Sequence, residues 1–147
     1  MEFLDTSDLR DEKIVLYKVR TSNENKERGW VPAYYFDIYL TDGTKIGYCD
    51  LRVGHNEETY IGGNIGYGID KDYRGNGYAA IAVELLKILA KNHNMEYLII
   101  ACKPDNIASY KTIEKSGGKF LELKEIPEGH ELRTITDEYE KIYRIDL

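Results

Sequence analysis

The chain has 147 residues, of which 42% are hydrophobic and 31% are charged, and its formal net charge at pH 7 is −6. This length suits one domain with one core, and residues 1–147 contain no linker that would divide them. The acidic balance argues against the basic surface of a nucleic-acid-binding protein. No apolar run is long enough to span a membrane, and the acidic start, Met1 to Asp5, lacks the basic region of a secretory signal. The sequence therefore predicts a cytoplasmic protein of one domain.

The cysteines and histidines do not form a recognisable metal motif. Cys49 and Cys102 lie in apolar segments without C-x-x-C or zinc spacing, so we expect reduced core residues. The three histidines are scattered as surface or loop residues: His55, His93 and His130. The sequence predicts no metal site.

The first half of the chain predicts an antiparallel start. A weakly periodic extended segment covers Ile14 to Val19, and a charged, Asn-rich segment from Thr21 to Arg28 predicts a loop or a short helix. Two strands are expected from Ala33 to Leu40 and from Lys45 to Val53, and Asp42-Gly43 between them is typical of a hairpin turn.

A third strand is expected from Tyr60 to Ile69, although it contains four glycines: Gly62, Gly63, Gly66 and Gly68. Glycine weakens strands, so a β-bulge, a sharp bend or a ligand lying against exposed backbone would explain them. A flexible loop is the alternative.

The segment Arg74-Gly75-Asn76-Gly77-Tyr78-Ala79 stands between this strand and a long helical pattern. The two glycines allow positive φ angles or a close approach of a ligand, and the first turn of a helix has amides without intrahelical partners. Arg74 and the helix dipole add positive charge, so the segment suits a pyrophosphate. On spacing alone, an ordinary tight turn remains the alternative.

The second half of the chain alternates helices and strands. An amphipathic helix is expected from Ala79 to Asn92, with an apolar face formed by Ile81, Ala82, Leu85, Leu86, Ile88 and Leu89. The continuous apolar run from Tyr97 to Cys102 predicts a buried strand, parallel to the one that ends at Ile69 and joined to it by a right-handed crossover. The remaining expected elements are a helix over Ile107 to Ser116 capped by Asp105 or Asn106, strands over Lys119 to Ile126 and Tyr139 to Asp146, and a polar loop over Pro127 to Asp137.

These features together resemble the GNAT superfamily of acyl-CoA-dependent N-acyltransferases. Arg74 to Ala79 is similar to the R/Q-x-x-G-x-G/A signature of that family, and the segment from Asn106 to Gly117 is similar to its second motif. The order of elements matches over roughly Tyr34 to Phe120. The resemblance implies an α/β (α+β) GNAT fold: a mixed, mostly antiparallel sheet of about six to seven strands, whose central parallel pair splays to admit coenzyme A, with helices on both faces.

The resemblance also implies a function and a set of site residues. The function is transfer of an acetyl group from acetyl-CoA to a primary amine of an unidentified acceptor, either a small molecule or a protein N-terminus or lysine. The transfer would occur by direct attack in a ternary complex and without a metal. The pyrophosphate of the cofactor would rest on the signature, and its pantetheine arm would lie between the splayed strands. The implied cofactor-binding residues are Tyr67, Gly68, Ile69, Arg74, Gly75, Asn76, Gly77, Tyr78, Ala79 and Asn106.

The chemistry needs a group that accepts the amine proton and a group that protonates the departing thiolate. The tyrosine that many family members use as the acid falls on Ile113, so we expect Ser109 or Tyr110 to serve, with Ser109 preferred. The glutamate that histone-type members use as the base falls near Gly63. The base stays open among Tyr67, Asp50, Glu57, Glu58 and solvent.

Two other functions are consistent with parts of the sequence. Gly75-Asn76-Gly77-Tyr78-Ala79-Ala80 satisfies the spacing of a dinucleotide-binding turn, but Lys103 stands where an acidic residue should follow the next strand. A catalytically degenerate module that binds coenzyme A for sensing or interaction is the second alternative. For the acceptor site we expect Trp30, Tyr34, Tyr35 and the 127–137 loop as lining, and the sequence leaves a homodimer open.

Overall fold

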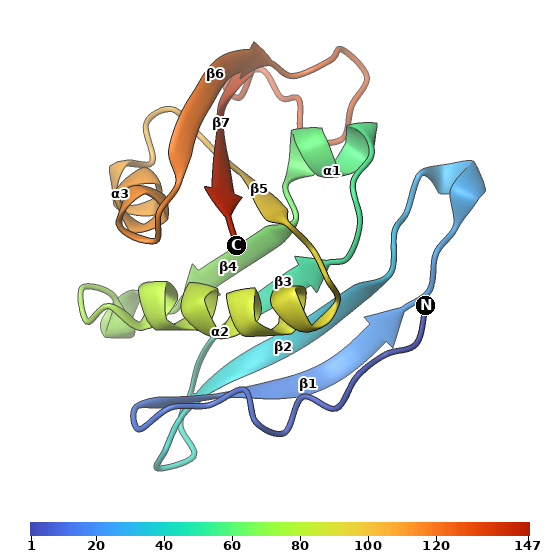
Figure 1. Cartoon of the computed structure of the whole chain (residues 1–147). Helices are drawn as coiled ribbons and strands as arrows, with labels where there is room; N and C mark the ends of the chain where they lie inside the picture. The colour runs from blue at the N-terminus through green and yellow to red at the C-terminus, as the bar shows by residue number, and fades with distance from the viewer.

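The computed structural model describes residues 1–147 and shows a mixed α and β fold with seven strands and three α-helices (Figure 1). The strands are β1 (Ile14–Ser22), β2 (Ala33–Leu40), β3 (Lys45–Arg52), β4 (Ile65–Ile69), β5 (Tyr97–Cys102), β6 (Lys119–Glu125) and β7 (Tyr139–Asp146). The helices are α1 (Glu57–Gly62), α2 (Tyr78–Asn92) and α3 (Ile107–Lys115), with short 3-10 turns η1 (Lys26–Arg28) and η2 (Lys71–Tyr73). The strands β2, β5 and β7 have the predicted bounds, and none of the helices combines the length and apolarity needed to cross a membrane.

The strands form two antiparallel sheets, one with the order β1-β2-β3-β4 and one with the order β5-β7-β6. The Asp42-Gly43 hairpin joins β2 to β3 as predicted: Gly43 has φ +92° and its amide donates to the carbonyl of Leu40. No ladder of hydrogen bonds pairs β4 with β5, so the structure has two sheets where the sequence predicts one mixed sheet. The parallel relation of β4 and β5 stays a prediction.

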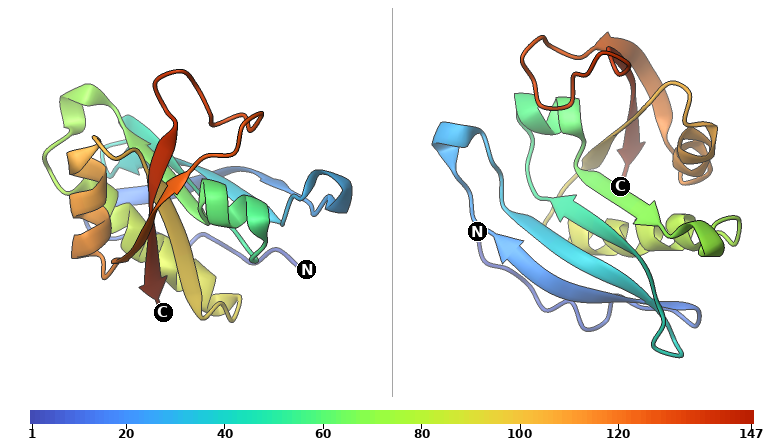
Figure 2. Two further views of the ribbon diagram at one scale, coloured as in Figure 1. Left: turned by 90° about the horizontal axis from the view of Figure 1, so that it is seen from above. Right: turned by 180° about the vertical axis from the view of Figure 1, so that it is seen from behind.

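The two sheets are connected at the start of β4 by the fully buried Asn64. Its amide donates to the carbonyl of Ile99 at 2.6 Å, and its side-chain Oδ1 accepts from the amide of Ile99 at 2.8 Å. Its Nδ2 donates to the carbonyls of Arg52 and Gly54, and its own carbonyl accepts from the amide of Arg52. One residue therefore joins β3, β4 and β5 at one point, beyond which β4 and β5 separate (Figure 2).

The predicted strand over Tyr60 to Ile69 is wrong in its first half, which forms α1. Asn56 caps this helix: its Oδ1 accepts from the amide of Thr59, and the Thr59 hydroxyl accepts from the amide of Asn56. This reciprocal pair and the acidic Glu57 and Glu58 in the first turn favour a helix start, although the segment is rich in residues typical of strands.

Helix α2 packs on the first sheet, but its buried face differs in part from the prediction. Ile88 is 49% exposed, whereas Val83 and Ala90 are fully buried. The buried arc is wider than one stripe because α2 also contacts α3. Helix α3 faces one side of the second sheet, where the Tyr143 hydroxyl contacts Glu114. Helix α1 lies against the other side, so both sides of that sheet carry a helix.

The Asn64→Ala variant should lower the free energy of unfolding by about 3 kcal/mol, because it leaves the Ile99 amide and two carbonyls without their buried partner. Urea unfolding of the two proteins measures the difference. Asn92→Ala, at the exposed end of α2, is the control and should change stability by less than about 0.5 kcal/mol. Equal losses in the two variants would contradict the role given to Asn64.

Candidate active site

A cleft of about 330 Å³, here called the inner cleft, opens between β4, the start of α2 and α3. Its lining residues are Tyr67, Gly68, Ile69, Tyr73, Arg74, Tyr78, Ala79, Asn106, Ala108, Ser109 and Thr112. Seven of the ten predicted cofactor-binding residues thus line one cleft. Gly75, Asn76 and Gly77 are exposed in the turn beside it and are not among its lining residues.

The turn before α2 has the backbone that its glycines predict. Gly75 and Gly77 have φ angles of +82° and +78°, and a Cβ at either position would meet no atom within 4 Å. The glycines are therefore required by their backbone angles and not by crowding within the protein. The amides of residues 75–80 donate to no acceptor in the protein, so six successive donors remain available at the positive end of a helix.

The side chains of Arg74 and Asn76 hold this turn in place. The Nε of Arg74 donates to the carbonyl of Ile69 at 2.8 Å, which ties the turn to the end of β4. The Nδ2 of Asn76 donates to the carbonyl of Tyr73 at 3.0 Å. The terminal nitrogens of Arg74 make no contact with protein acceptors and stay available for an anion.

The strand β4 has one paired edge and one open edge. The bonds from the Arg52 amide to the Asn64 carbonyl and from the Asp70 amide to the Ile46 carbonyl fix the alternation of the β3–β4 ladder. On this register the backbone groups of Gly66 and Gly68 face β3, and those of Tyr67 and Ile69 face away from it. Tyr67 and Ile69 therefore offer backbone groups at the open edge, whereas the backbone of Gly68 is directed at Tyr48.

Side chains of the neighbouring strand lie over Gly66 and Gly68 of β4. A Cβ at Gly68 would lie 2.5 Å from the Tyr48 ring, and a Cβ at Gly66 would lie 3.2 Å from the Asp50 carboxylate. The β3–β4 register shows no shift, so the β-bulge considered for this strand is absent. Gly63 has φ +84°, and a Cβ there would press on the backbone of β5 at 3.2 Å. A side chain is therefore disfavoured at Gly63, near which the family resemblance would place a glutamate, both by the positive φ angle and by the close approach to β5.

The predicted acid Ser109 lies in the inner cleft, opposite Tyr67. Its Oγ is 3.1 Å from the Tyr67 hydroxyl, and its amide donates to the Oδ1 of Asn106, which caps α3. Burial raises the pKa of Tyr67, so this phenol stays protonated at neutral pH. The two hydroxyls form a short polar chain that could carry a proton to an atom in the cleft.

The alternative acid, Tyr110, is placed differently. It is not among the lining residues of the inner cleft, and the Lys141 ammonium lies 3.9 Å from the centre of its ring. Ile113, on the next turn of α3, is fully buried in the core. Of the two candidates, the structure brings only Ser109 into the cleft.

A second cleft, here called the outer cleft, has a volume of about 390 Å³ and lies beside the first sheet. It is lined by Arg20, Ser22, Gly29, Trp30, Val31, Ala33, Tyr35, Arg52, Glu58, Thr59, Gly62, His130, Glu131 and Leu132. Trp30, Tyr35 and part of the 127–137 loop, which were expected to lie together, all line this cleft, and its role as an acceptor site stays a prediction. The expectation for Tyr34 is wrong: its side chain is fully buried and its hydroxyl contacts the Leu4 amide and His93.

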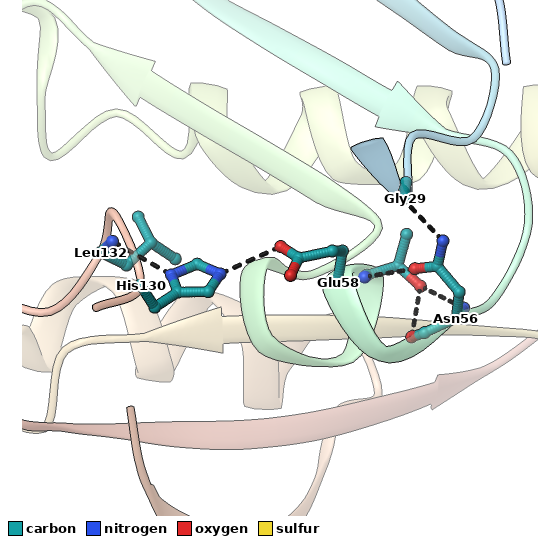
Figure 3. A network of polar contacts seen from close by, with 6 residues as sticks. Gly29, Asn56, Glu58, His130 and Leu132 are labelled. Carbon is teal, nitrogen blue, oxygen red and sulfur yellow. Dashed lines mark hydrogen bonds and ion pairs between the residues drawn. The ribbon is translucent and has the colours of Figure 1, made fainter. Parts of the chain in front are cut away.

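Polar contacts from α1 join the walls of the outer cleft (Figure 3). The amide of Leu132 donates to the Nδ1 of His130 at 3.1 Å, so in the neutral ring the proton is on Nε2. That Nε2 donates to the carboxylate of Glu58 at 3.0 Å, and Asn56 donates to the carbonyl of Gly29 at 2.8 Å. Helix α1 is thereby tied to the 127–137 loop on one side and to the segment before β2 on the other.

Asp50 lies on β3 directly opposite Gly66 of β4, on the side of the sheet that carries Arg52. Its side chain is only 13% exposed, and the Arg52 guanidinium donates to it at 2.7 Å. Burial raises the pKa of Asp50 above its ordinary value, although Arg52 acts in the opposite direction. This carboxyl is therefore better able to accept a proton than an exposed aspartate.

Several notable residues were not predicted from the sequence. Asn64 looks like any polar residue in a glycine-rich segment, and Glu140 occupies a polar position in the alternation of β7. Glu140 is buried, which raises its pKa to about 7, and its Oε1 has no hydrogen-bond partner. Nowhere do three or more His, Cys, Asp or Glu side chains form a group that could hold a metal ion.

Comparison with known proteins agrees with this geometry. The family model described as the acetyltransferase (GNAT) domain matches residues 3–119. The curated protein called uncharacterized N-acetyltransferase YnaD, from Bacillus subtilis (strain 168), is 33% identical over an alignment of 113 residues that covers 73% of this chain and 63% of that protein.

Solved structures show a similar fold. The ribosomal-protein-S5-alanine acetyltransferase from Vibrio fischeri aligns with a TM-score of 0.63 and 20% identity over 78% of this chain and 61% of that chain. The microcin C7 self-immunity acetyltransferase MccE, solved in complex with acetyl-CoA and AMP, aligns with a TM-score of 0.61 and 20% identity over the same shares. The present chain spans a little under two thirds of the length of these relatives.

Proposed function

Because this chain belongs to the GNAT acetyltransferase family, as the match over residues 3–119 shows, we propose that it transfers an acetyl group from acetyl-CoA to a primary amine. The observation that carries the proposal is the inner cleft, which runs along the open edge of β4 and has the turn with six unpaired amides at its side. The match with a solved acetyl-CoA complex supports the choice of this cofactor.

The residues of the inner cleft and of the turn beside it fit the parts of acetyl-CoA. The amides of residues 75–80 and the guanidinium of Arg74 are donors for the pyrophosphate. Tyr67 and Ile69 offer backbone groups to the amides of the pantetheine arm, as a neighbouring strand would. The Nδ2 of Asn106 is free for the arm because only the Oδ1 is used in capping α3.

The transfer forms a nitrogen–carbon bond, breaks the carbon–sulfur bond of the thioester and moves two protons. Acetyl-CoA supplies the acetyl group and leaves as the free thiol. Asp50, which lies on β3 opposite Gly66 of β4, accepts the proton that the amine loses. Ser109 donates a proton to the departing sulfur and regains it from Tyr67 or solvent. The unpaired amide of Tyr67 is a donor for the carbonyl oxygen as negative charge develops on it.

The Gly77→Glu variant tests the cofactor site. A carboxylate at the start of α2 repels a pyrophosphate and fills the space beside the turn, so the affinity for acetyl-CoA should fall at least about 100-fold. Calorimetric titration with acetyl-CoA measures the affinity, with NAD as a second ligand. Unchanged binding of acetyl-CoA by the variant would overturn the assignment. Binding of NAD but not of acetyl-CoA by the native protein would also overturn it.

The matched control is Gly129→Glu. Gly129 also has a positive φ, +81°, with no atom near a Cβ, and it lines neither cleft. The two variants therefore share the backbone strain and the added charge. The control should bind acetyl-CoA like the native protein.

The Ser109→Ala variant tests the acid. Release of free thiol with a primary amine should show a kcat lower by about 100-fold and a nearly unchanged KM for acetyl-CoA, because the hydroxyl acts on the leaving sulfur. Thr112→Val, in the same cleft, and Tyr110→Phe, outside it, should keep kcat within about threefold. A large loss in Tyr110→Phe with none in Ser109→Ala would reverse the assignment. Tight binding of acetyl-CoA without thiol release from any amine would instead favour a binding module.

A further inference from the structure

Four directly opposed residues form a row across the first sheet: Arg20 on β1, Tyr35 on β2, Asp50 on β3 and Gly66 on β4. Directly opposed residues of antiparallel strands point to the same side of the sheet. The row therefore runs from the strand that borders the inner cleft to the floor of the outer cleft, where Arg20 and Tyr35 are lining residues.

The positive charge at the far end of this row is available to a ligand. The Arg20 guanidinium lies 3.7 Å from the centre of the Tyr35 ring, which orients it over β2. It is exposed and forms no ion pair or hydrogen bond with the protein. A guanidinium stacked on an aromatic ring keeps its N–H edges free, and these edges match the oxygens of a carboxylate or phosphate.

The spacing of the strands gives the distances between the residues of the row. Neighbouring strands lie about 4.8 Å apart, so the guanidinium above β2 is about 10 Å from β4 across the sheet. Asp50 lies between these two points, next to Gly66. Asp50 does not itself line the outer cleft, but it is directly opposite the lining residue Tyr35 and contacts the lining residue Arg52. A carboxyl therefore borders the outer cleft on the side of β4, and a cation lies further along the same row.

Arg52 adds to the positive charge of the outer cleft but is already engaged by Asp50 at 2.7 Å. A ligand with a second cationic group would meet Arg20 and Arg52 and be repelled. The acidic residues of the lining, Glu58 on α1 and Glu131 in the 127–137 loop, are not part of the row, and His130 contacts Glu58.

We propose that the outer cleft binds an acceptor whose primary amine reaches Asp50 and whose carboxylate or phosphate, about 6–10 Å from that amine, is held by Arg20. This inference rests on the proposed acetyl transfer and names the class of its substrate. Tyr35 positions the guanidinium, and the apolar part of the acceptor lies along the row between the two charges.

Acetylation of a series of ω-amino acids measures the preferred distance between the amine and the carboxylate of the acceptor. The value of kcat/KM should rise from β-alanine through γ-aminobutyrate to ε-aminocaproate, which should exceed its neutral amide, ε-aminocaproamide, by about tenfold or more. The corresponding aminohexyl phosphate distinguishes a phosphate from a carboxylate as the preferred anion. Equal rates for the acid, the phosphate and the neutral amide would overturn the inference.

The Arg20→Gln variant assigns the effect to this residue. It should lower kcat/KM for ε-aminocaproate about tenfold while leaving the rate with the neutral amide unchanged. Lys18→Gln removes the same charge from the same strand outside the cleft and should keep the preference. Equal losses with both amines in Arg20→Gln would overturn the role of Arg20. Absence of acetylation with every amine would instead contradict the proposed function. Titration with acetyl-CoA tests the cofactor site of that proposal separately.

Discussion

The arrangement of the two sheets depends on the hydrogen bonds of one buried asparagine. Asn64 uses its amide, its carbonyl and both side-chain polar atoms, and its partners are on β3, β5 and the segment after β3. A buried amide side chain is stable only where its donors and acceptors are paired, so these contacts also fix its position. Gly63 completes the junction, because a side chain there would press on β5.

The junction explains why β4 has an open edge. Since Asn64 makes the hydrogen bonds to β5 and no ladder pairs β4 with β5, the backbone groups of Tyr67 and Ile69 have no strand paired with them. An open edge is unfavourable unless something covers it, and here the inner cleft lies along it. The turn before α2, with its unpaired amides, is at the same end of β4 because Arg74 is tied to Ile69. The proposed cofactor site is therefore a consequence of how β4 leaves the second sheet.

The inner cleft is lined by β4, whereas the outer cleft is lined by β1, β2, the end of β3, α1 and the 127–137 loop, and this arrangement separates the proposed tasks. Tyr67 and Ile69 line the inner cleft, and the Tyr67 hydroxyl contacts Ser109. The glycines at positions 66 and 68 leave the other side to Asp50 and Tyr48 of β3. A cofactor and an acceptor could thus approach the same strand from opposite sides without competing for space.

Local patterns were enough to predict most elements and the backbone of the turn before α2. The Asp42-Gly43 hairpin, the apolar run of β5 and the positive φ angles of Gly75 and Gly77 are determined by nearby residues. Features that depend on distant residues were not predictable: the contacts of Asn64 with Ile99, the row from Arg20 to Gly66, and the burial of Tyr34 and Glu140. Helix α1 lies between these two groups in predictability. Its Asn56 cap was visible in the sequence, but the glycines and aromatic residues after it favoured a strand.

The most direct test of this account is amide hydrogen exchange of β4 and the start of α2, measured with and without coenzyme A. If the open edge and the unpaired amides bind the cofactor, exchange at Tyr67 and at residues 75–80 should slow markedly on saturation, whereas the Gly66 and Gly68 amides, which already face β3, should change little. Saturable binding of coenzyme A with unchanged exchange at Tyr67 and residues 75–80 would contradict the account.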